Sequence, residues 1–234
     1  MPNNVVLNNV DHRDLTVALR HGAEFGDAVN QVQVFPPEFE AAQREFPIVF
    51  QRTSAGLEAV ALLGLDRDEN LFLDGHRWTS RHIPLLQQRG PFSIGTDATD
   101  AGAPILYVDL DDPRTGAADG APIFLQHGGN GPYLDHVMHL LRLIHAGVDG
   151  ARAMYAAFDA LGLIEPAAVE VMLSEDTRYA ITGYEVLARE RLNALNGAQL
   201  ESLHMAGFLS PAFLIATSLG NISDLIARKN ARAA

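Results

Sequence analysis

The chain contains no cysteine, and this absence excludes several kinds of chemistry at once. Disulfide bonds, a thiolate nucleophile and cysteine-ligated zinc or iron–sulfur clusters all require that side chain. The chain therefore has to fold without covalent cross-links. Its 234 residues, 47% of them hydrophobic, are sufficient, because a chain of this length buries roughly 70% of its unfolded surface.

Basic residues are scarce as well. The chain has 17 Lys and Arg residues against 29 Asp and Glu residues, a formal net charge of −12, and Lys229 is its single lysine. Such an excess of negative charge repels phosphate backbones and anionic membrane surfaces. We therefore expect no nucleic-acid partner and no docking on an anionic membrane.

Long apolar runs are also missing. Residues 1–11 lack the basic start and the apolar segment of a signal peptide. The best candidate for a membrane span, residues 202–223, carries His204, Pro211 and Asn221 and is too polar to cross a bilayer comfortably. These features predict a cytoplasmic, soluble protein without membrane insertion, and they leave its oligomeric state open.

The N-terminal half has the pattern of short strands separated by turns. Strands are predicted at residues 47–50, 59–63, 71–73, 92–94 and 105–110, and short helices at 36–46 and 83–89. Asp74-Gly75 is a strong turn signal. Residues 111–122, rich in Gly, Ala and Asp, are predicted to be a loop.

The C-terminal half is mainly helical. One helix is predicted to begin at Pro132 and end near Gly147, and a second to end at Gly162. A hairpin is expected around Glu175-Asp176. A helical stretch over 192–206, with a break near Gly197, precedes a last helix that begins at Ser210-Pro211. The last helix carries an apolar stripe, interpreted as core rather than as a dimer face: Ile215, Leu219, Ile222 and Ile226.

These patterns predict an α+β fold: a β-rich N-terminal half with central helices, a β-hairpin and a C-terminal helical pair. We expect residues 1–234 to form a single domain. The loop at 111–131 is the best place for a subdivision.

Two motifs fail at named positions. Residues 66–70 have the first ligand positions of a calcium-binding EF-hand loop, but Leu71 replaces the required glycine and Arg77 the final glutamate. Residues 127–131, His-Gly-Gly-Asn-Gly, resemble the oxyanion loop of lipases. No serine in the chain has the flanking glycines of the matching nucleophile elbow. We interpret both stretches as turns or loops.

Two further clusters also have simple structural interpretations. His136 and His139 are three apart and could share a metal, but they fall on the polar side of the predicted helix, whereas His145 falls on its apolar face. Asp109, Asp111 and the adjacent Asp112 are typical of a strand that ends in an aspartate turn. The sequence therefore predicts no metal, no cofactor and no catalytic residue.

The most informative stretch is the arginine segment, defined here as residues 75–96, which contains no acidic residue. Its candidate binding residues are Arg77, Trp78, Arg81 and Arg89. Arginine beside an aromatic side chain suits recognition of a carboxylate, a phosphate or an acidic partner. The alternative is that Trp78 belongs to the core and the arginines pair with acids such as Asp97 and Asp109.

Several short blocks occur together in a recognisable order. They are Glu38-Phe39, residues 46–50, 62–65 and 70–72, Arg77-Trp78, Ile83-Pro84, residues 89–92 and 183–195, Leu203, and residues 207–209 and 218–225. In order and spacing the chain resembles the SapC-like bacterial proteins. It departs from their pattern at His82, Gln88 and Gly90, where that family usually has an aromatic residue, an arginine and an aromatic residue. The same name is also used for an unrelated peptide-transporter permease. That protein must cross the membrane several times, which we do not expect of this chain.

The resemblance implies a link to bacterial surface-layer or serum-resistance loci, and to genes near flavin-dependent tryptophan halogenases and cupin-like oxygenases. It supplies no catalytic residue. We therefore expect an accessory or binding protein with a protein partner and without a catalytic site of its own. The alternative is an enzyme, or an enzyme subunit, that acts on an aromatic amino-acid-like substrate beside such a halogenase.

Overall fold

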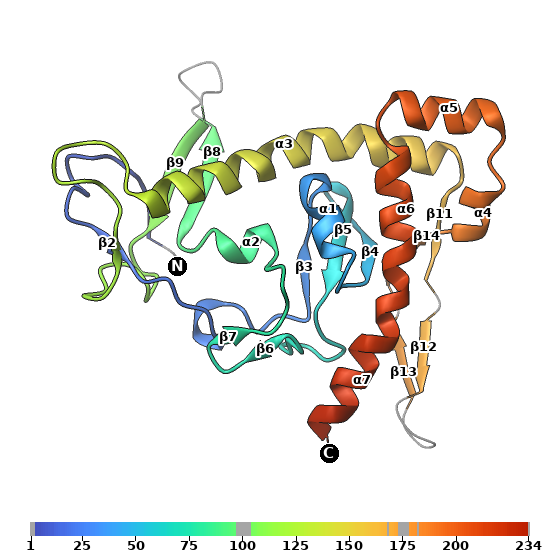
Figure 1. Cartoon of the computed structure of the whole chain (residues 1–234), viewed down its shortest axis with the longest axis horizontal. Coiled ribbons are helices and arrows are strands. Elements are labelled where there is room, and N and C mark those ends of the chain that lie inside the picture. The colour runs from blue at the N-terminus through green and yellow to red at the C-terminus, as the bar shows by residue number, and fades with distance from the viewer. Residues whose placement is uncertain (1–2, 97–103, 168, 173–177, 182, 234) are drawn as a thin grey trace. The chain divides into compact units, whose positions relative to one another are not determined.

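The computed structural model describes residues 3–96, 104–167, 169–172, 178–181 and 183–233 (Figure 1). Its internal contacts divide the chain into two compact units. The first unit comprises Met1–Asp27, Gly75–Arg77 and Leu85–His145, and the second comprises Ala28–Asp74, Trp78–Pro84 and Ala146–Ala234. The expectation of a single domain stays a prediction.

The first unit is built around a small antiparallel sheet. Its strand order is β1 (Asn4–Val6), β9 (Pro104–Asp109), β8 (Phe92–Thr96). A second pair joins β10 (Ala121–Pro122) to β2 (Thr16–Val17). The unit also contains the 3-10 helix η1 (Ala23–Phe25) and the single-turn helix α2 (Leu85–Gln88). Phe92, Val108 and Ile123 are completely buried in its core.

The second unit contains a five-stranded antiparallel sheet. Its order is β11 (Ile164–Pro166), β14 (Glu185–Leu187), β4 (Ile48–Thr53), β5 (Gly56–Leu62), β3 (Gln31–Gln33). Ile48, Val49 and Phe50 are all buried. Successive strand residues point to opposite faces, so both faces of the sheet are covered at β4. This explains why the sequence shows a continuous apolar run there rather than alternation.

Aromatic side chains fill the interior of the second unit. Phe46 and Phe72 meet edge to face at 4.7 Å between ring centroids, and Phe50 and Tyr155 do so at 5.2 Å. The 3-10 helix η2 (Pro36–Glu38) leads into α1 (Phe39–Ala42), which buries Phe39. A two-stranded sheet of β12 (Val169–Met172) and β13 (Arg178–Ile181) completes the strands of this unit. A further pair joins β6 (Leu73–Asp74) to β7 (Arg77–Trp78), of which Arg77 is assigned to the first unit.

The C-terminal part of the second unit is helical, as predicted. It comprises α4 (Arg189–Asn193), α5 (Gly197–Met205), α6 (Leu209–Ser218), the 3-10 helix η3 (Leu219–Asn221) and α7 (Ile222–Ala233). Asn196 caps α5 by accepting a hydrogen bond from the Gln199 N–H. Gly207, at a φ of 75°, provides the left-handed turn after α5.

The continuous helical stretch Leu209–Arg232 is long and apolar enough, by length and composition alone, to cross a membrane. In the second unit one side of it is packed: Ile215 and Leu225 are fully buried, and the Ser218 hydroxyl accepts a hydrogen bond from the Ile48 N–H at 2.9 Å. Ile215 confirms the core interpretation of the apolar stripe at one position, while Leu219, Ile222 and Ile226 are half-buried. The absence of membrane insertion stays a prediction.

The sequence-based boundary at Gly147 is wrong. Helix α3 runs without interruption over Pro132–Ala160, where two helices were predicted. Gly147 lies inside this helix. A larger residue would not fit there, because a Cβ at this position would come within 2.7 Å of the Phe35 Cβ. The glycine therefore marks a close contact between two elements and not a helix end. His145 is a second correction: it is exposed on α3 and not on an apolar face.

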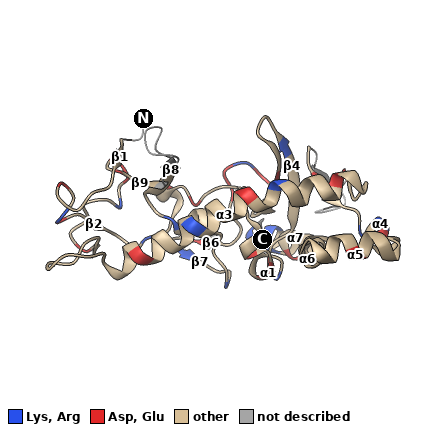
Figure 2. Cartoon of the chain, turned by 90° about the horizontal axis from the view of Figure 1, so that it is seen from above, with Lys and Arg blue, Asp and Glu red and all other residues tan. Residues whose placement is uncertain are grey.

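The α+β prediction, with a β-rich N-terminal half, is confirmed. The predicted hairpin is present as β12 and β13, while its tip at Glu175-Asp176 lies outside the described residues. Acidic and basic residues alternate along α3, as Figure 2 shows. They are, in order, Asp135, Arg142, Asp149, Arg152 and Asp159.

Candidate functional site

The arginine segment is divided between the two units. Arg77 and Arg89 belong to the first unit, and Trp78 and Arg81 belong to the second. The structure therefore does not bring the four residues together within one unit, and their common site stays a prediction. The surroundings of the three arginines differ: Arg77 and Arg81 are exposed, whereas Arg89 is enclosed within the first unit.

Trp78 is a core residue, with 7% of its surface exposed. This agrees with the alternative interpretation of the arginine segment, in which Trp78 belongs to the core. The neighbouring Arg77, on the same short strand β7, is exposed and forms no ion pair with any described residue. Alternation along a strand places adjacent side chains on opposite faces, which accounts for this difference.

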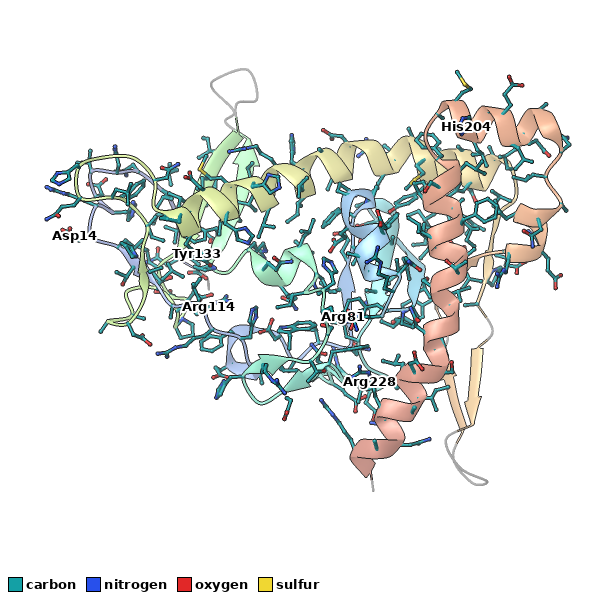
Figure 3. All side chains as sticks on the ribbon, in the orientation of Figure 1. Asp14, Arg81, Arg114, Tyr133, His204 and Arg228 are labelled. Atoms are coloured by element: carbon teal, nitrogen blue, oxygen red, sulfur yellow. The ribbon has the colours of Figure 1, made fainter. Side chains whose placement is uncertain are left out.

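Arg81 is an exposed residue of the second unit (Figure 3), and its backbone is anchored by a neighbouring carboxylate. The carboxylate of Glu45 accepts hydrogen bonds from the Arg81 N–H at 2.8 Å and from the His82 N–H at 3.1 Å. The His82 Nε2 lies 2.9 Å from Oε2 of Glu38, a carboxylate that is 3% exposed. The Arg81 guanidinium itself is exposed and forms no ion pair with the described residues.

Glu38 links this display site to the start of α1. Its second oxygen, Oε1, accepts a hydrogen bond from the Phe35 N–H at 3.1 Å. A buried carboxylate needs such partners, because removing it from water is otherwise costly. Glu38 and Glu45 therefore hold the chain at residues 81–82 rigidly, while the Arg81 side chain stays free for an external contact.

Arg89 is held inside the first unit. It donates from Nη1 to the Phe92 carbonyl at 2.7 Å, and its Nε is buried without a hydrogen-bond partner among the described residues. Burial lowers the pKa of Arg89, repulsion from Arg114 lowers it further, and Asp112 opposes both effects. This is an internal arginine rather than one displayed for a partner.

Arg114 and Asp112 form the strongest ion pair of this region. Arg114 donates from Nε and Nη2 to the two oxygens of Asp112, at 2.9 and 2.6 Å. Burial lowers the pKa of Arg114, but the hydrogen bonds to Asp112 and the negative charge of that carboxylate, with smaller contributions from Tyr133 and Asp27, together raise it overall. Its guanidinium lies 5.5 Å from the centroid of the Phe25 ring. Neither Arg114 nor Asp112 was identified from the sequence as a partner of Arg89.

Tyr133 borders the same cluster (Figure 3). Burial raises the pKa of Tyr133 to about 12, partly offset by the nearby Arg114. Its hydroxyl lies 2.6 Å from the place a Cβ would occupy at Gly90, which has a φ of 62°. Gly90 is a departure from the SapC pattern, and this close approach explains why glycine fits there.

The other sequence motifs have structural roles. Asp66 and Glu69, from the failed EF-hand pattern, both bind the Lys229 ammonium, at 2.5 and 2.6 Å. Asp109 accepts hydrogen bonds from the Asn3 and Asp111 N–H groups rather than from an arginine. The other predicted arginine partner, Asp97, lies outside the described residues. Among the described residues, no three His, Asp or Glu side chains are grouped to hold a metal ion.

One signal in the sequence could have identified the Arg114 cluster. Asp112 is followed two residues later by Arg114, and an aspartate in a turn commonly accepts from the N–H two positions on. The structure shows that bond at 2.9 Å. It orients the carboxylate toward the Arg114 side chain. The role of Tyr133 depends on tertiary packing and gives no comparable local signal.

With the fold and these side chains placed, comparison with known families gives one match. The family model named SapC matches residues 7–225, which is nearly the whole chain. The chain belongs to the SapC family, as the resemblance in the sequence predicted. No curated protein and no solved structure matches it.

Proposed function

We propose that this SapC-family protein is an accessory or binding protein without a catalytic site of its own, and that each of two exposed arginines, Arg77 of the first unit and Arg81 of the second, contacts acidic groups of a protein partner. One observation carries the proposal: both guanidinium groups are exposed, and neither forms an ion pair with the described residues. The chain's net charge is −12, so unpaired arginines are not explained by a shortage of internal acids.

The anchoring of residue 81 supports the same role. Two N–H groups at 81 and 82 are bound to Glu45, so the backbone below Arg81 loses little freedom when a partner binds. Arginine recognises planar carboxylates through paired hydrogen bonds, and each such contact contributes about 1.5–3 kcal/mol. A partner presenting Asp or Glu side chains fits this chemistry.

No group of catalytic side chains among the described residues favours the enzyme alternative. The His82–Glu38 pair has the geometry of an oriented imidazole, but the nearby Ser80 hydroxyl donates to the His82 carbonyl at 2.7 Å and not to the ring. Ser80 is therefore not oriented toward this histidine as a nucleophile. The link to halogenase or surface-layer loci stays an expectation from family membership.

The test is affinity capture from native lysate with wild-type protein, the double variant Arg77→Ala/Arg81→Ala and the control Arg67→Ala. Arg67 is also exposed and forms no ion pair with the described residues. A partner that binds wild type and Arg67→Ala, but is weakened roughly tenfold to a hundredfold with the double variant, supports the proposal. Equal capture by all three proteins, or substrate turnover by the purified protein alone, contradicts it.

A further inference from the structure

A groove in the second unit is lined by no residue of the arginine segment. It is formed by the second half of α3, the turn between β4 and β5, and the chain that follows β3. Its volume is about 280 Å³. At roughly 30 Å³ for each water molecule, that space suits a small ligand rather than a macromolecule.

The floor of the groove is apolar and rigid. It is lined by Val34, Phe35, Leu57, Ala151 and Tyr155. Tyr155 is held by its edge-to-face ring contact with Phe50, and burial raises its pKa. Phe35 is fixed by its close contact with Gly147. The site is thus already formed without a ligand, which lowers the entropic cost of binding.

The rim carries two arginines in different states. Arg52 binds Glu185 through Nη2, at 2.9 and 3.2 Å, and lies 3.8 Å from Asp159. Arg152 is exposed at the rim and forms no ion pair with any described residue. Arg152 therefore provides a positive charge beside the apolar floor that is not engaged in an ion pair with the described residues.

We propose that this groove binds a small monocarboxylate with an apolar body, its carboxylate held by Arg152 and its body packed on Tyr155 and Phe35. Glu58 and Asp159 also line the groove and repel anions, so Arg152 can compensate one negative charge of a ligand but a second one would have no partner. They disfavour dicarboxylates and phosphate esters, which leaves a singly charged anion. The inference is independent of the function proposed for Arg77 and Arg81.

Isothermal titration calorimetry with hexanoate tests the proposal directly. We expect saturable binding of hexanoate, and markedly weaker binding of 1-hexanol, hexylamine and adipate, which share its apolar body but lack the single negative charge. Wild-type protein that does not bind hexanoate, or that binds hexanol equally well, overturns the proposal.

Three variants locate the site. Arg152→Gln should weaken hexanoate binding about tenfold to a hundredfold, because a charge-assisted contact is lost. Ala156→Leu places a larger side chain in the groove and should block binding, while Arg142→Gln, on the same helix outside the groove, should have no effect. Equal binding by all three variants overturns the proposal.

Thermal unfolding of each variant verifies that its fold is intact, and the Arg77→Ala/Arg81→Ala protein should bind hexanoate normally. If the wild-type protein binds hexanoate but captures no partner that depends on Arg77 and Arg81, only the function proposed for these two arginines fails. If it captures such a partner but does not bind hexanoate, only the groove proposal fails.

Discussion

Two arginines of the first unit differ in what they do for the fold. Arg114 is 7% exposed and forms a two-point ion pair with Asp112, whereas Arg77 is exposed and forms no ion pair with the described residues. Removing one partner of a buried pair leaves a stranded charge, but removing an isolated surface charge has little effect.

Arg114→Ala should therefore lower the free energy of unfolding by about 3–5 kcal/mol, and Arg77→Ala should change it by no more than about 0.5 kcal/mol. Urea denaturation of both variants measures this difference. A large loss of stability in Arg77→Ala would show that this arginine is structural and would remove it from the binding surface.

Tyr133 makes stability depend on alkaline pH. Its pKa is raised from 10.0 to about 12 by burial, so the unfolded chain loses this proton at a lower pH than the folded protein. Between pH 10 and 12 the unfolded state is favoured increasingly, and the contribution of this residue falls by about 2–3 kcal/mol, at 1.36 kcal/mol for each pKa unit.

Tyr133→Phe should remove that part of the alkaline decline. The measurement is urea denaturation of wild-type and variant protein at several pH values between 9 and 11.5. Parallel curves for the two proteins would mean that Tyr133 is not desolvated in solution.

At the scale of elements, α3 depends on a glycine in its interior. Glycine normally costs a helix about 1 kcal/mol relative to alanine, so Gly→Ala usually stabilises. At Gly147 the added Cβ would meet the Cβ of Phe35 at 2.7 Å and Cδ of Pro37 at 3.2 Å. At Gly150, three residues later in the same helix, a Cβ would meet nothing within 4 Å.

Gly147→Ala should therefore destabilise the protein by about 1–3 kcal/mol, because α3 or the chain at Phe35 has to move. Gly150→Ala should stabilise it by about 0.5–1 kcal/mol. Differential scanning calorimetry of the two variants gives the comparison. Stabilisation by both substitutions would show that the α3–Phe35 contact is looser than the structure indicates.

The elements that could be predicted are those whose signals are local. The apolar run at 48–50, the turn at Gly75 and the break at Gly197 all follow from the chemistry of a few adjacent residues. The continuity of α3 could not be predicted, because Gly147 reflects contact with Phe35, more than a hundred positions earlier. A helix-ending glycine and a contact glycine look the same in sequence.

The candidate site shows the same limit. The sequence identified the arginine segment from its lack of acidic residues, and it offered burial as one interpretation of Trp78, which the structure confirms. It could not separate the displayed Arg81 from the enclosed Arg89, because that difference is made by Glu45 in one unit and by Arg114 and Asp112 in the other. The groove at Arg152 gave no signal, since its walls come from three distant stretches.

At the scale of the whole molecule, the charge balance governs association in solution. The net charge of −12 at pH 7 keeps copies of the chain apart, and this repulsion disappears near the isoelectric point of about 5.1. We expect solubility to be lowest near pH 5 and to increase toward pH 7. Static light scattering across this range measures the effect, and a solubility minimum near neutral pH would contradict it.

The ion pairs of Lys229 determine which crosslinking reagents can be used to identify the protein's partners. This lysine is the chain's single ε-amine, and its ammonium is bound by Asp66 and Glu69, with 17% of its side-chain surface exposed. These hydrogen bonds raise its pKa, so very little of the reactive neutral amine is present at ordinary pH. Lysine-directed crosslinkers will therefore react poorly at this side chain when they are used to join the folded protein to a partner. Reagents that activate carboxylates or react with guanidinium groups suit a search for whatever binds it.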